Sequence, residues 1–316
     1  MEKKKVIVLT GPTASGKTSL GIELAKKIDG EVISAESMQV YKTLDVGTAK
    51  VSAEEQKEVK HHLIDICNMD EEFSVASFKS LCYDKINDII KRKKVPIIVG
   101  GTGLYINSVI YNMNFSSQED DMVKEYRQYL YDLASKNGNM YVYDMLKKVD
   151  EDSIKNIHPN NLKRVVRALE MAKFSGKKKS EHIEEEKERI EKLKDTSQYE
   201  FFVYYIELPR DILYDRINLR VEKMFQDERM LKEARLIYDL GDRASRTCRQ
   251  AIGYKELFPY FEGIKSLDEC KEELKRATRK YAKRQITWFN NKLNKKNIDG
   301  TNSYKENVDI IINDLS

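Results

Sequence analysis

The chain has 316 residues, of which 41% are hydrophobic and 34% are charged. This apolar share suffices for a substantial core and excludes a mostly disordered chain, because disorder needs low hydrophobicity together with a large charge imbalance. Lysine and arginine number 56 against 52 aspartates and glutamates, so the net charge is only +4, and any nucleic-acid surface must come from local clusters of basic residues.

The cysteines and the apolar runs indicate a protein of the reducing cytoplasm. The cysteines, Cys67, Cys82, Cys248 and Cys270, stand far apart and form no C-x-x-C pair, so they predict neither a zinc site nor a disulfide scaffold. No stretch approaches the ~20 apolar residues of a transmembrane helix. We therefore expect a cytoplasmic chain without a membrane segment.

The first hundred residues alternate strand and helix patterns. Short, β-branched and almost wholly apolar runs are typical of strands covered on both faces of a parallel sheet, and they occupy residues 6–9, 31–34, 63–66 and 95–99. Helical spacing separates them over residues 15–28, 53–60 and 75–92. This alternation predicts a doubly wound α/β layer.

Residues 112–199 differ in character, because they contain no clear strand pattern. Helical spacing occupies residues 126–134, 141–147, 162–174 and the charge-dense 180–194. We interpret this segment as a mostly helical insertion domain, with 180–194 as an exposed arm, since a helix that is polar nearly all round is not a core helix. The α/β core then comprises residues 1–111 and 200–316, with a further strand at 201–208 and helices over 211–225, 228–240 and 268–293.

A phosphate-binding motif follows the first strand and opens the first helix. It matches G-x-x-x-x-G-K-[ST] in the context that identifies a P-loop, and its residues are Gly11, Pro12, Thr13, Ala14, Ser15, Gly16, Lys17 and Thr18. In such a loop backbone N–H groups and the positive end of the helix hold phosphate oxygens. Lys17 neutralises phosphate charge, and the Thr18 hydroxyl can ligate Mg²⁺. The motif predicts a P-loop NTPase-like fold with Mg²⁺ as cofactor.

The motif does not say what is done to the phosphate. A small-molecule kinase is the default interpretation, but no apolar strand after the loop ends in the Asp of a Walker B element, and the run 95–99 leads instead into Gly100-Gly-Thr-Gly103. The second strand runs into a polar loop, residues 34–41, at the carboxyl edge of the sheet. Ligands bind at that edge in open α/β sheets.

Several stretches together resemble the tRNA dimethylallyltransferases, also called isopentenyl-tRNA transferases. Besides the P-loop they are residues 34–41, 45–50 (DVGTAK), 61–65 (HHLID), 100–105 (GGTGLY), 158–160, 164–170 and 281–288 (YAKRQITW). They follow one another through nearly the whole chain, and their combination is highly specific. Eukaryotic relatives append a zinc finger where this chain has Asn/Lys-rich sequence, so we expect the bacterial type.

The resemblance implies a reaction and its partners. Enzymes of this family move a dimethylallyl group from dimethylallyl diphosphate to N6 of adenosine 37, next to the anticodon of tRNAs that read codons beginning with U. It implies that the P-loop holds the donor diphosphate and that Arg220 clamps it from a second side. For Arg216, one turn before Arg220 on the same helix face, a solvated face or a salt bridge is the alternative. We expect a monomer that binds the anticodon stem-loop.

One residue departs from the family pattern. The family has an Asp in the loop after the second strand, which serves as general base toward N6, and this chain has Glu36 there. Glutamate is one methylene longer but can still accept a proton. We expect Glu36, Thr18 and Arg220 to be the catalytic residues. Impaired catalysis is the alternative, and a role of the carboxylate in holding a Mg²⁺-bound water is compatible with either.

Basic residues form three clusters. On the helix over 268–293, Arg276, Arg279, Lys280, Lys283 and Arg284 recur at offsets of 0, 3, 4, 7 and 8, which is one helix face and suits phosphate contacts, although a solvated face is the ordinary alternative. Lys163, Arg164 and Arg167 form the second cluster, and Arg246 and Arg249 form the third. By resemblance, these clusters contact the anticodon stem-loop. The predicted tRNA-binding residues are Glu36, Ser37, Met38, Gln39, Thr102, Lys163, Arg164, Val165, Val166, Arg167, Arg249, Arg276, Arg279, Lys283 and Arg284.

Two further functions stay open at the level of sequence. An adenylate isopentenyltransferase would prenylate free AMP or ADP, but such a small acceptor needs neither the long insertion nor the basic helix. A homologue that binds tRNA without transferring a prenyl group is compatible with Glu36.

Overall fold

The computed structural model describes residues 3–115, 121–174 and 178–315. The chain forms two compact units, one made of Met1–Met113 with Gln198–Ser316 and the other of Asn114–Ser197. The second unit lies within the predicted insertion domain, residues 112–199. Nowhere in the described ranges does a helix combine the length and the apolar character that a bilayer span requires.

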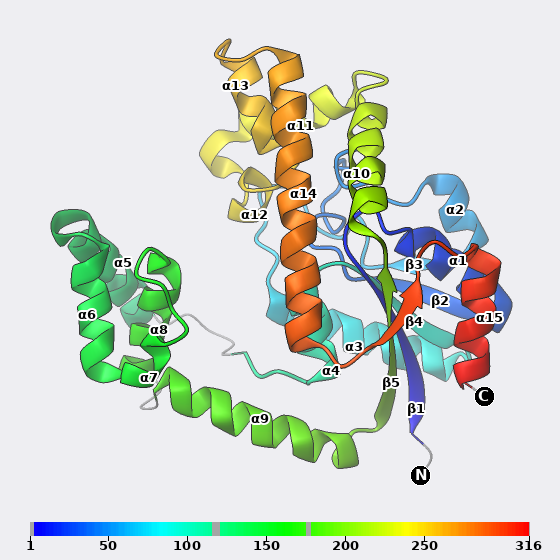
Figure 1. The fold of residues 1–316 in the computed structure, drawn as a ribbon, viewed down its shortest axis with the longest axis horizontal. Coiled ribbons are helices and arrows are strands. Elements are labelled where there is room, and N and C mark those ends of the chain that lie inside the picture. The colour runs from blue at the N-terminus through cyan, green and yellow to red at the C-terminus, as the bar shows by residue number, and fades with distance from the viewer. Residues whose placement is uncertain (1–2, 116–120, 175–177, 316) are drawn as a thin grey trace. The chain divides into compact units, whose positions relative to one another are not determined.

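A six-stranded parallel sheet, in the order β3-β2-β4-β1-β5-β6, forms the centre of the first unit (Figure 1). The strands are β1 (Lys4–Thr10), β2 (Gly30–Ser34), β3 (His61–His62), β4 (Val95–Gly100), β5 (Tyr199–Glu207) and β6 (Lys296–Asp299). The central strand β1 pairs with β4 and β5, so that Thr10 lies beside Gly100 and Tyr205. The predicted α/β fold with a parallel sheet is confirmed.

Side chains of β1 alternate between two apolar layers. Val6 and Val8 belong to the layer that includes α3 (Val75–Lys91) and α4 (Gly103–Ile110). Ile7 and Leu9 belong to the opposite layer with α1 (Lys17–Ile28) and α15 (Tyr304–Leu315) (Figure 1). Because both faces are covered, the strands are apolar throughout rather than alternating.

The third strand lies earlier than the sequence predicts. The expected strand at 63–66 is wrong, and the strand is His61–His62. Leu63 and Asp65 have φ angles of 61° and 56°, in the left-handed region that a strand cannot continue through. Strand β6 and helix α15, after residue 293, are not predicted by the sequence patterns.

Helices at the carboxyl end of the sheet build a third apolar core. They are α10 (Arg210–Met224), α11 (Arg229–Leu240), α12 (Arg246–Arg249), α13 (Phe258–Phe261) and α14 (Leu267–Lys292). The short helix α2 (Ala53–Glu58) contacts α1. Val221, Met230, Tyr254 and Leu274 pack there with Tyr41 from the loop after β2. Helices α10 and α14 run side by side (Figure 1).

The second unit has its own small core. Its helices are α5 (Asp121–Asn137), α6 (Asn139–Val149), α7 (Glu151–Ile154), α8 (Leu162–Phe174) and α9 (Lys179–Thr196). Leu130, Leu146 and Leu169 are buried between α5, α6 and α8. The buried carboxylate of Asp150 accepts hydrogen bonds from the backbone N–H and the hydroxyl of Ser180, which fixes the start of α9.

Candidate functional site

The P-loop joins β1 to α1 and turns sharply over the end of the sheet. Ala14 and Gly16 have φ angles of 64° and 89°, and helix α1 begins directly at Lys17. At Gly11 an added Cβ would lie 2.8 Å from Ser15 Oγ and 3.1 Å from the Ile206 carbonyl oxygen, so only glycine fits. This geometry leaves the first N–H groups of α1 for an anion. The N–H groups of Thr13 and Ser15 instead donate within the chain, to Gln285 Oε1 and to the Pro12 carbonyl.

Lys17 is buried and its charge is balanced by Glu36. Its Nζ lies 3.1 Å from Glu36 Oε1, and Lys17 is only 7% exposed. The same oxygen of Glu36 accepts a hydrogen bond of 2.8 Å from the backbone N–H of Gly101. Glu36 follows β2 and Gly101 follows β4, which are neighbouring strands, so the parallel sheet brings the two loops together.

Arg220 reaches the P-loop from α10. Its Nη1 donates to Thr13 Oγ1 at 2.9 Å. Its Nε and the hydroxyl of Ser15 are buried and have no hydrogen-bond partner among the residues that the structure describes. Burial lowers the pKa of the Arg220 guanidinium, against the opposing effect of the negative charge of Glu36. Because buried polar groups are normally hydrogen-bonded, the free donors of Arg220 and Ser15 indicate a ligand that supplies acceptors.

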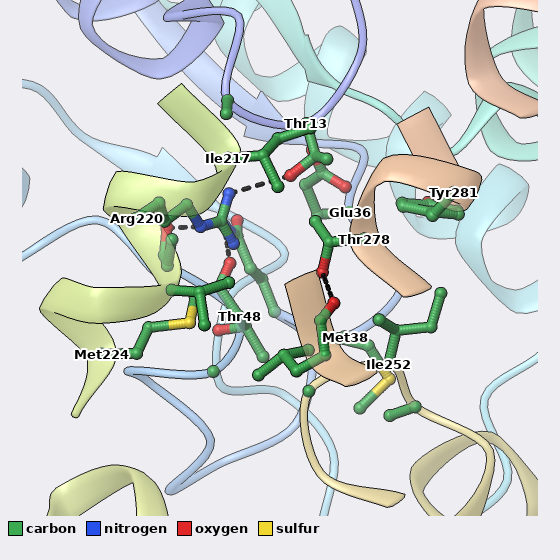
Figure 2. A pocket seen from close by; sticks show the side chains of 18 of the residues that line it. Thr13, Glu36, Met38, Thr48, Ile217, Arg220, Met224, Ile252, Thr278 and Tyr281 are labelled. Atoms are coloured by element: carbon green, nitrogen blue, oxygen red, sulfur yellow. Dashed lines mark hydrogen bonds between the residues drawn. The ribbon is translucent and has the colours of Figure 1, made fainter. Parts of the chain in front are cut away.

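Thr13, Lys17, Glu36 and Arg220 line one cavity of about 420 Å³. Figure 2 shows Thr13, Glu36 and Arg220 gathered on one side of it, with Met38, Met224 and Ile252 on another. The lining residues include Thr13, Ala14, Gly16, Lys17, Thr18, Glu36, Ser37, Met38, Gln39, Gly47, Thr48, Ala49, Ile217, Arg220, Val221, Met224, Thr247, Ala251, Ile252, Leu274, Thr278 and Tyr281. A charged end next to an apolar wall suits a ligand that is itself polar at one end and apolar at the other.

The wall formed by residues 47–49 is held by a buried carboxylate. Glu233 on α11 accepts hydrogen bonds from the backbone N–H groups of Asp45, Val46 and Gly47 at 3.0, 2.8 and 3.1 Å. It also accepts one of 2.8 Å from the hydroxyl of Tyr254. The sequence patterns do not identify Glu233 as a functional residue. Its backbone partners in the loop after β2 lie up to 188 positions away in the sequence, so the residues next to it on α11 give no sign of its role.

The predicted tRNA-binding residues 36–39, in the loop after β2, differ in what their side chains and backbone contact. Glu36 and Met38 present side chains to the cavity (Figure 2). The backbone N–H of Ser37 donates to Thr102 Oγ1 at 3.0 Å, which ties this loop to the one after β4. Gln39 lines the cavity, but its side-chain amide is used within the chain. Its Oε1 accepts a hydrogen bond from Ser34 Oγ, and its Nε2 donates to the carbonyls of residues 48 and 49, so Gln39 stabilises the loop.

Among the two predicted arginines of α10, only Arg220 lines the cavity. Arg216 is half-buried and lies one turn away. Ile217, Val221 and Met224 share the cavity face of α10 with Arg220. Their i, i+3, i+4 and i+7 spacing is the signal that could have identified this wall from the sequence.

The basic face of α14 is outward. Arg276, Lys280, Lys283 and Arg284 are exposed, whereas Arg279 is half-buried and donates to Asn218 Oδ1 at 2.6 Å. The opposite face carries the buried Ala282, Gln285 and Phe289, and Tyr281, whose pKa is raised by burial, lines the cavity.

The predicted RNA-binding residues on α8 include three exposed cations and two buried valines. Lys163, Arg164 and Arg167 are exposed, and Arg167 forms a 3.0 Å ion pair with Glu170. Val165 and Val166 are 0% and 1% exposed in the core of the second unit. Their side chains therefore cannot contact RNA, although they follow two basic residues in the sequence.

The third cluster, Arg246 and Arg249, lies on the short helix α12, where Arg246 is exposed and Arg249 is half-buried. Arg249 at the end of α12 is ion-paired with the exposed Asp242, and its Nε is buried with no hydrogen-bond partner within residues 3–115, 121–174 and 178–315. The neighbouring Thr247 and Gln250 line the cavity.

Comparison with known proteins identifies relatives over almost the whole length. The model of the family described as IPP transferase matches residues 39–292. A protein of Bacillus cytotoxicus named tRNA dimethylallyltransferase is 45% identical over 304 residues, which cover 96% of this chain and 93% of that protein. One of the same name from Thermoanaerobacter sp. (strain X514) is 46% identical over 286 residues, 90% of this chain and 88% of the relative.

Solved structures agree with these relatives. The tRNA delta(2)-isopentenylpyrophosphate transferase of Staphylococcus epidermidis is 40% identical, superposes with a TM-score of 0.70 and covers 99% of both chains. A eukaryotic dimethylallyltransferase, described as acting on tRNA, is 30% identical with a TM-score of 0.77 over 99% of this chain and 79% of its own.

Proposed function

The chain belongs to the IPP transferase family, and from this premise we propose that it transfers a dimethylallyl group from dimethylallyl diphosphate to N6 of adenosine 37 in tRNAs that read codons beginning with U. The products are N6-(dimethylallyl)adenosine and diphosphate. The observation that carries the proposal is the single cavity in which a phosphate cradle, the cations Lys17 and Arg220 and the carboxylate of Glu36 meet beside an apolar wall.

The donor diphosphate binds the P-loop in this proposal. Breaking the C–O bond to diphosphate places negative charge on the leaving group, and donors fixed in advance stabilise that charge. The first N–H groups of α1 and Lys17 supply them from one side, and the guanidinium of Arg220 supplies them from the other. The unpaired Nε of Arg220 and hydroxyl of Ser15 are groups that the diphosphate oxygens would satisfy.

Glu36 is the proposed general base. The exocyclic amine of adenine is a weak nucleophile because its lone pair is delocalised into the ring, so a carboxylate that accepts its proton assists the attack. The 3.1 Å pair between Lys17 and Glu36 balances both charges before substrates bind. A bound diphosphate gives Lys17 a second anionic partner, which leaves more of the carboxylate of Glu36 available to the amine.

Enzymes of this family generally depend on a divalent metal, and we propose that Mg²⁺ is the ion. Within residues 3–115, 121–174 and 178–315, no group of three or more His, Cys, Asp and Glu side chains gathers as a metal cage. The hydroxyl of Thr18, which lines the cavity, fits Mg²⁺ instead, because this ion is usually held by few protein ligands together with phosphate oxygens and water. When bound, Mg²⁺ would add positive charge to the leaving diphosphate.

The tRNA is the proposed acceptor, bound by its anticodon stem-loop. The outward basic residues of α14, the exposed cations of α8 and Arg249 would contact phosphates, whose attraction is electrostatic and independent of sequence. The target base must leave its stack to reach a buried diphosphate. We propose that the chain acts as a monomer in the cytoplasm.

One assay tests the function against its rivals. The protein is incubated with radiolabelled dimethylallyl diphosphate and either bulk tRNA or AMP, and a parallel sample receives labelled ATP. Label in tRNA supports the proposal, and label in AMP indicates an adenylate isopentenyltransferase. Transfer from ATP to a small molecule indicates a kinase, and tRNA binding without transfer indicates a homologue impaired by Glu36.

A further inference from the structure

The buried amide of Gln285 joins the two loops that carry the site. Gln285 lies on α14 and is 5% exposed. Its Oε1 accepts a hydrogen bond of 2.9 Å from the backbone N–H of Thr13, and its Nε2 donates one of 2.9 Å to the carbonyl of Gly101. The amide orientation is fixed by these partners, because one is a donor and the other is an acceptor.

Each bridged loop holds one of the proposed reacting groups. The hydroxyl of Thr13 accepts from Arg220, and the N–H of Gly101 donates to Glu36. Gln285 therefore stands between the diphosphate clamp and the general base. No side chain could be added at Gly101, since its Cβ would overlap Gln285 Nε2 and lie 3.3 Å from Glu36 Oε1.

We propose that Gln285 is a positioning residue for prenyl transfer, which sets the distance between the donor loop and Glu36. The proposal rests on the proposed function. Helix α14 carries the outward basic residues Lys283 and Arg284 directly before Gln285, so the proposed tRNA-binding face and the donor loop share one helix. The position of α14 thereby determines both where the RNA lies and where the diphosphate is held.

A matched control is available on α4. Asn107 is also a buried amide, 6% exposed, and its Nδ2 donates to the carbonyl of Lys292 at the end of α14 at 3.1 Å. Asn107→Leu removes a buried polar tie to α14 without touching the P-loop or Gly101. Gln285→Met keeps the length of the side chain and removes both of its hydrogen bonds.

The first measurement is the affinity for inorganic diphosphate and the kinetics of transfer. Gln285→Met should weaken diphosphate binding about tenfold and reduce kcat/KM by about 10- to 100-fold, the loss that a small misplacement of reacting groups produces. Its affinity for tRNA should stay within about twofold, as phosphate contacts on the outer face are unchanged. Asn107→Leu should leave diphosphate affinity and kcat/KM near those of the wild type.

The second measurement is a pH profile, which a merely structural role would not alter. Gln285→Glu keeps an acceptor for Thr13 but places a carboxylate oxygen against the carbonyl of Gly101. Protonation of the introduced carboxyl restores the donor, so the activity of this variant relative to the wild type should rise as the pH falls. Equal losses in Gln285→Met and Asn107→Leu, or unaltered diphosphate affinity and kcat/KM in Gln285→Met, or a flat ratio for Gln285→Glu, would overturn the proposal.

The two proposals fail in different ways. If the wild-type protein binds diphosphate but transfers no prenyl group to tRNA, the proposed function is lost. The diphosphate affinities of Gln285→Met and Asn107→Leu still decide whether Gln285 positions the donor loop.

Discussion

The two ends of the parallel sheet each bury a cluster of charges, and the clusters differ in how completely their members are paired. At the amino end, Glu31 on β2 has a side chain only 4% exposed. It accepts two hydrogen bonds from Arg92 and lies 2.7 Å from His62 Nε2. These partners, Arg92 first, lower the pKa of Glu31 to about 2.

At the carboxyl end the pairing is incomplete. Lys17 and Glu36 face each other at 3.1 Å. The buried Nε of Arg220 and the buried hydroxyl of Ser15, however, find no hydrogen-bond partner in the described part of the chain. A cluster whose bonds are all made within the chain stabilises the fold, whereas one with unused donors is prepared for a ligand. We therefore expect substitutions at the two ends to act on different properties.

The largest expected effect is that of Glu36→Gln. The amide keeps the size and the hydrogen-bond acceptor but cannot take the proton, so turnover should fall by roughly 10²- to 10⁴-fold. Binding of dimethylallyl diphosphate and tRNA should persist, as measured by equilibrium titration, and the melting temperature should change little. Wild-type turnover in this variant would show that Glu36 is not the general base. The incompletely paired charges at the carboxyl end of the sheet would then not be explained by catalysis through Glu36.

Glu36→Asp sharpens that result by restoring the family residue. Activity near or above the wild type would mean that the loop keeps the family geometry and tolerates the longer side chain. A large loss would mean that the backbone has withdrawn to accommodate glutamate.

The next effect concerns the diphosphate cradle. Lys17→Ala or Arg220→Ala should each reduce kcat/KM by on the order of 10²-fold or more, because each removes a donor to the leaving group. Affinity for tRNA, measured separately, should hardly change. Unaltered turnover of the Arg220 variant would place the clamp on another residue.

At the opposite end, Glu31→Gln should reduce stability and spare turnover. The folded pKa of Glu31 lies below its ordinary value, so its stabilisation is complete above pH ~4.5 and is lost as the pH falls toward 2. The shift corresponds to about 3 kcal/mol in the free energy of unfolding at neutral pH, less whatever solvent screening of the exposed Arg92 removes. Denaturant titrations should show that the variant has a lower free energy of unfolding than the wild type at pH 7 and nearly the same free energy near pH 2.

The mildest effect belongs to the basic residues of α14, of which Lys283 and Arg284 are exposed and Arg279 is half-buried. Replacing Arg279, Lys283 and Arg284 together by alanine should make the slope of log K against log salt shallower by up to about 2–3 units, near one per lost phosphate contact. A double alanine variant of Lys57 and Lys91, which are exposed on α2 and α3, serves as control. An unchanged slope in the triple variant would show that the basic face is only solvated.

Most of the fold can be predicted because its signals are local. The apolar runs of β1, β2, β4 and β5 indicate strands covered on both faces, and helix α8 occupies the predicted residues 162–174. The prediction of the third strand at residues 63–66 is wrong, because no pattern of hydrophobicity indicates the left-handed backbone of Leu63 and Asp65. Strand β6 has one buried residue, Ile298, which is too little for periodicity to detect.

The candidate site can be predicted only in part, for a related reason. The P-loop is a contiguous motif and is found directly. Glu36 and Arg220 are identified by resemblance to a family. The framework that holds them, Gln285 and Glu233, consists of buried polar residues whose partners lie far away in the sequence, and their selection depends on tertiary contacts that no window of sequence contains.

The chain carries a single tryptophan, and its location makes it a built-in optical probe. Trp288 lies on α14 one turn from Gln285 and packs so closely against Gly103, at the start of α4, that no side chain could be added there. Its indole Nε1 is buried and has no hydrogen-bond partner among the described residues, so its emission depends on local packing and on any water that enters. All intrinsic tryptophan fluorescence therefore reports on the junction between α14 and α4, and stopped-flow mixing can follow that junction without an attached dye.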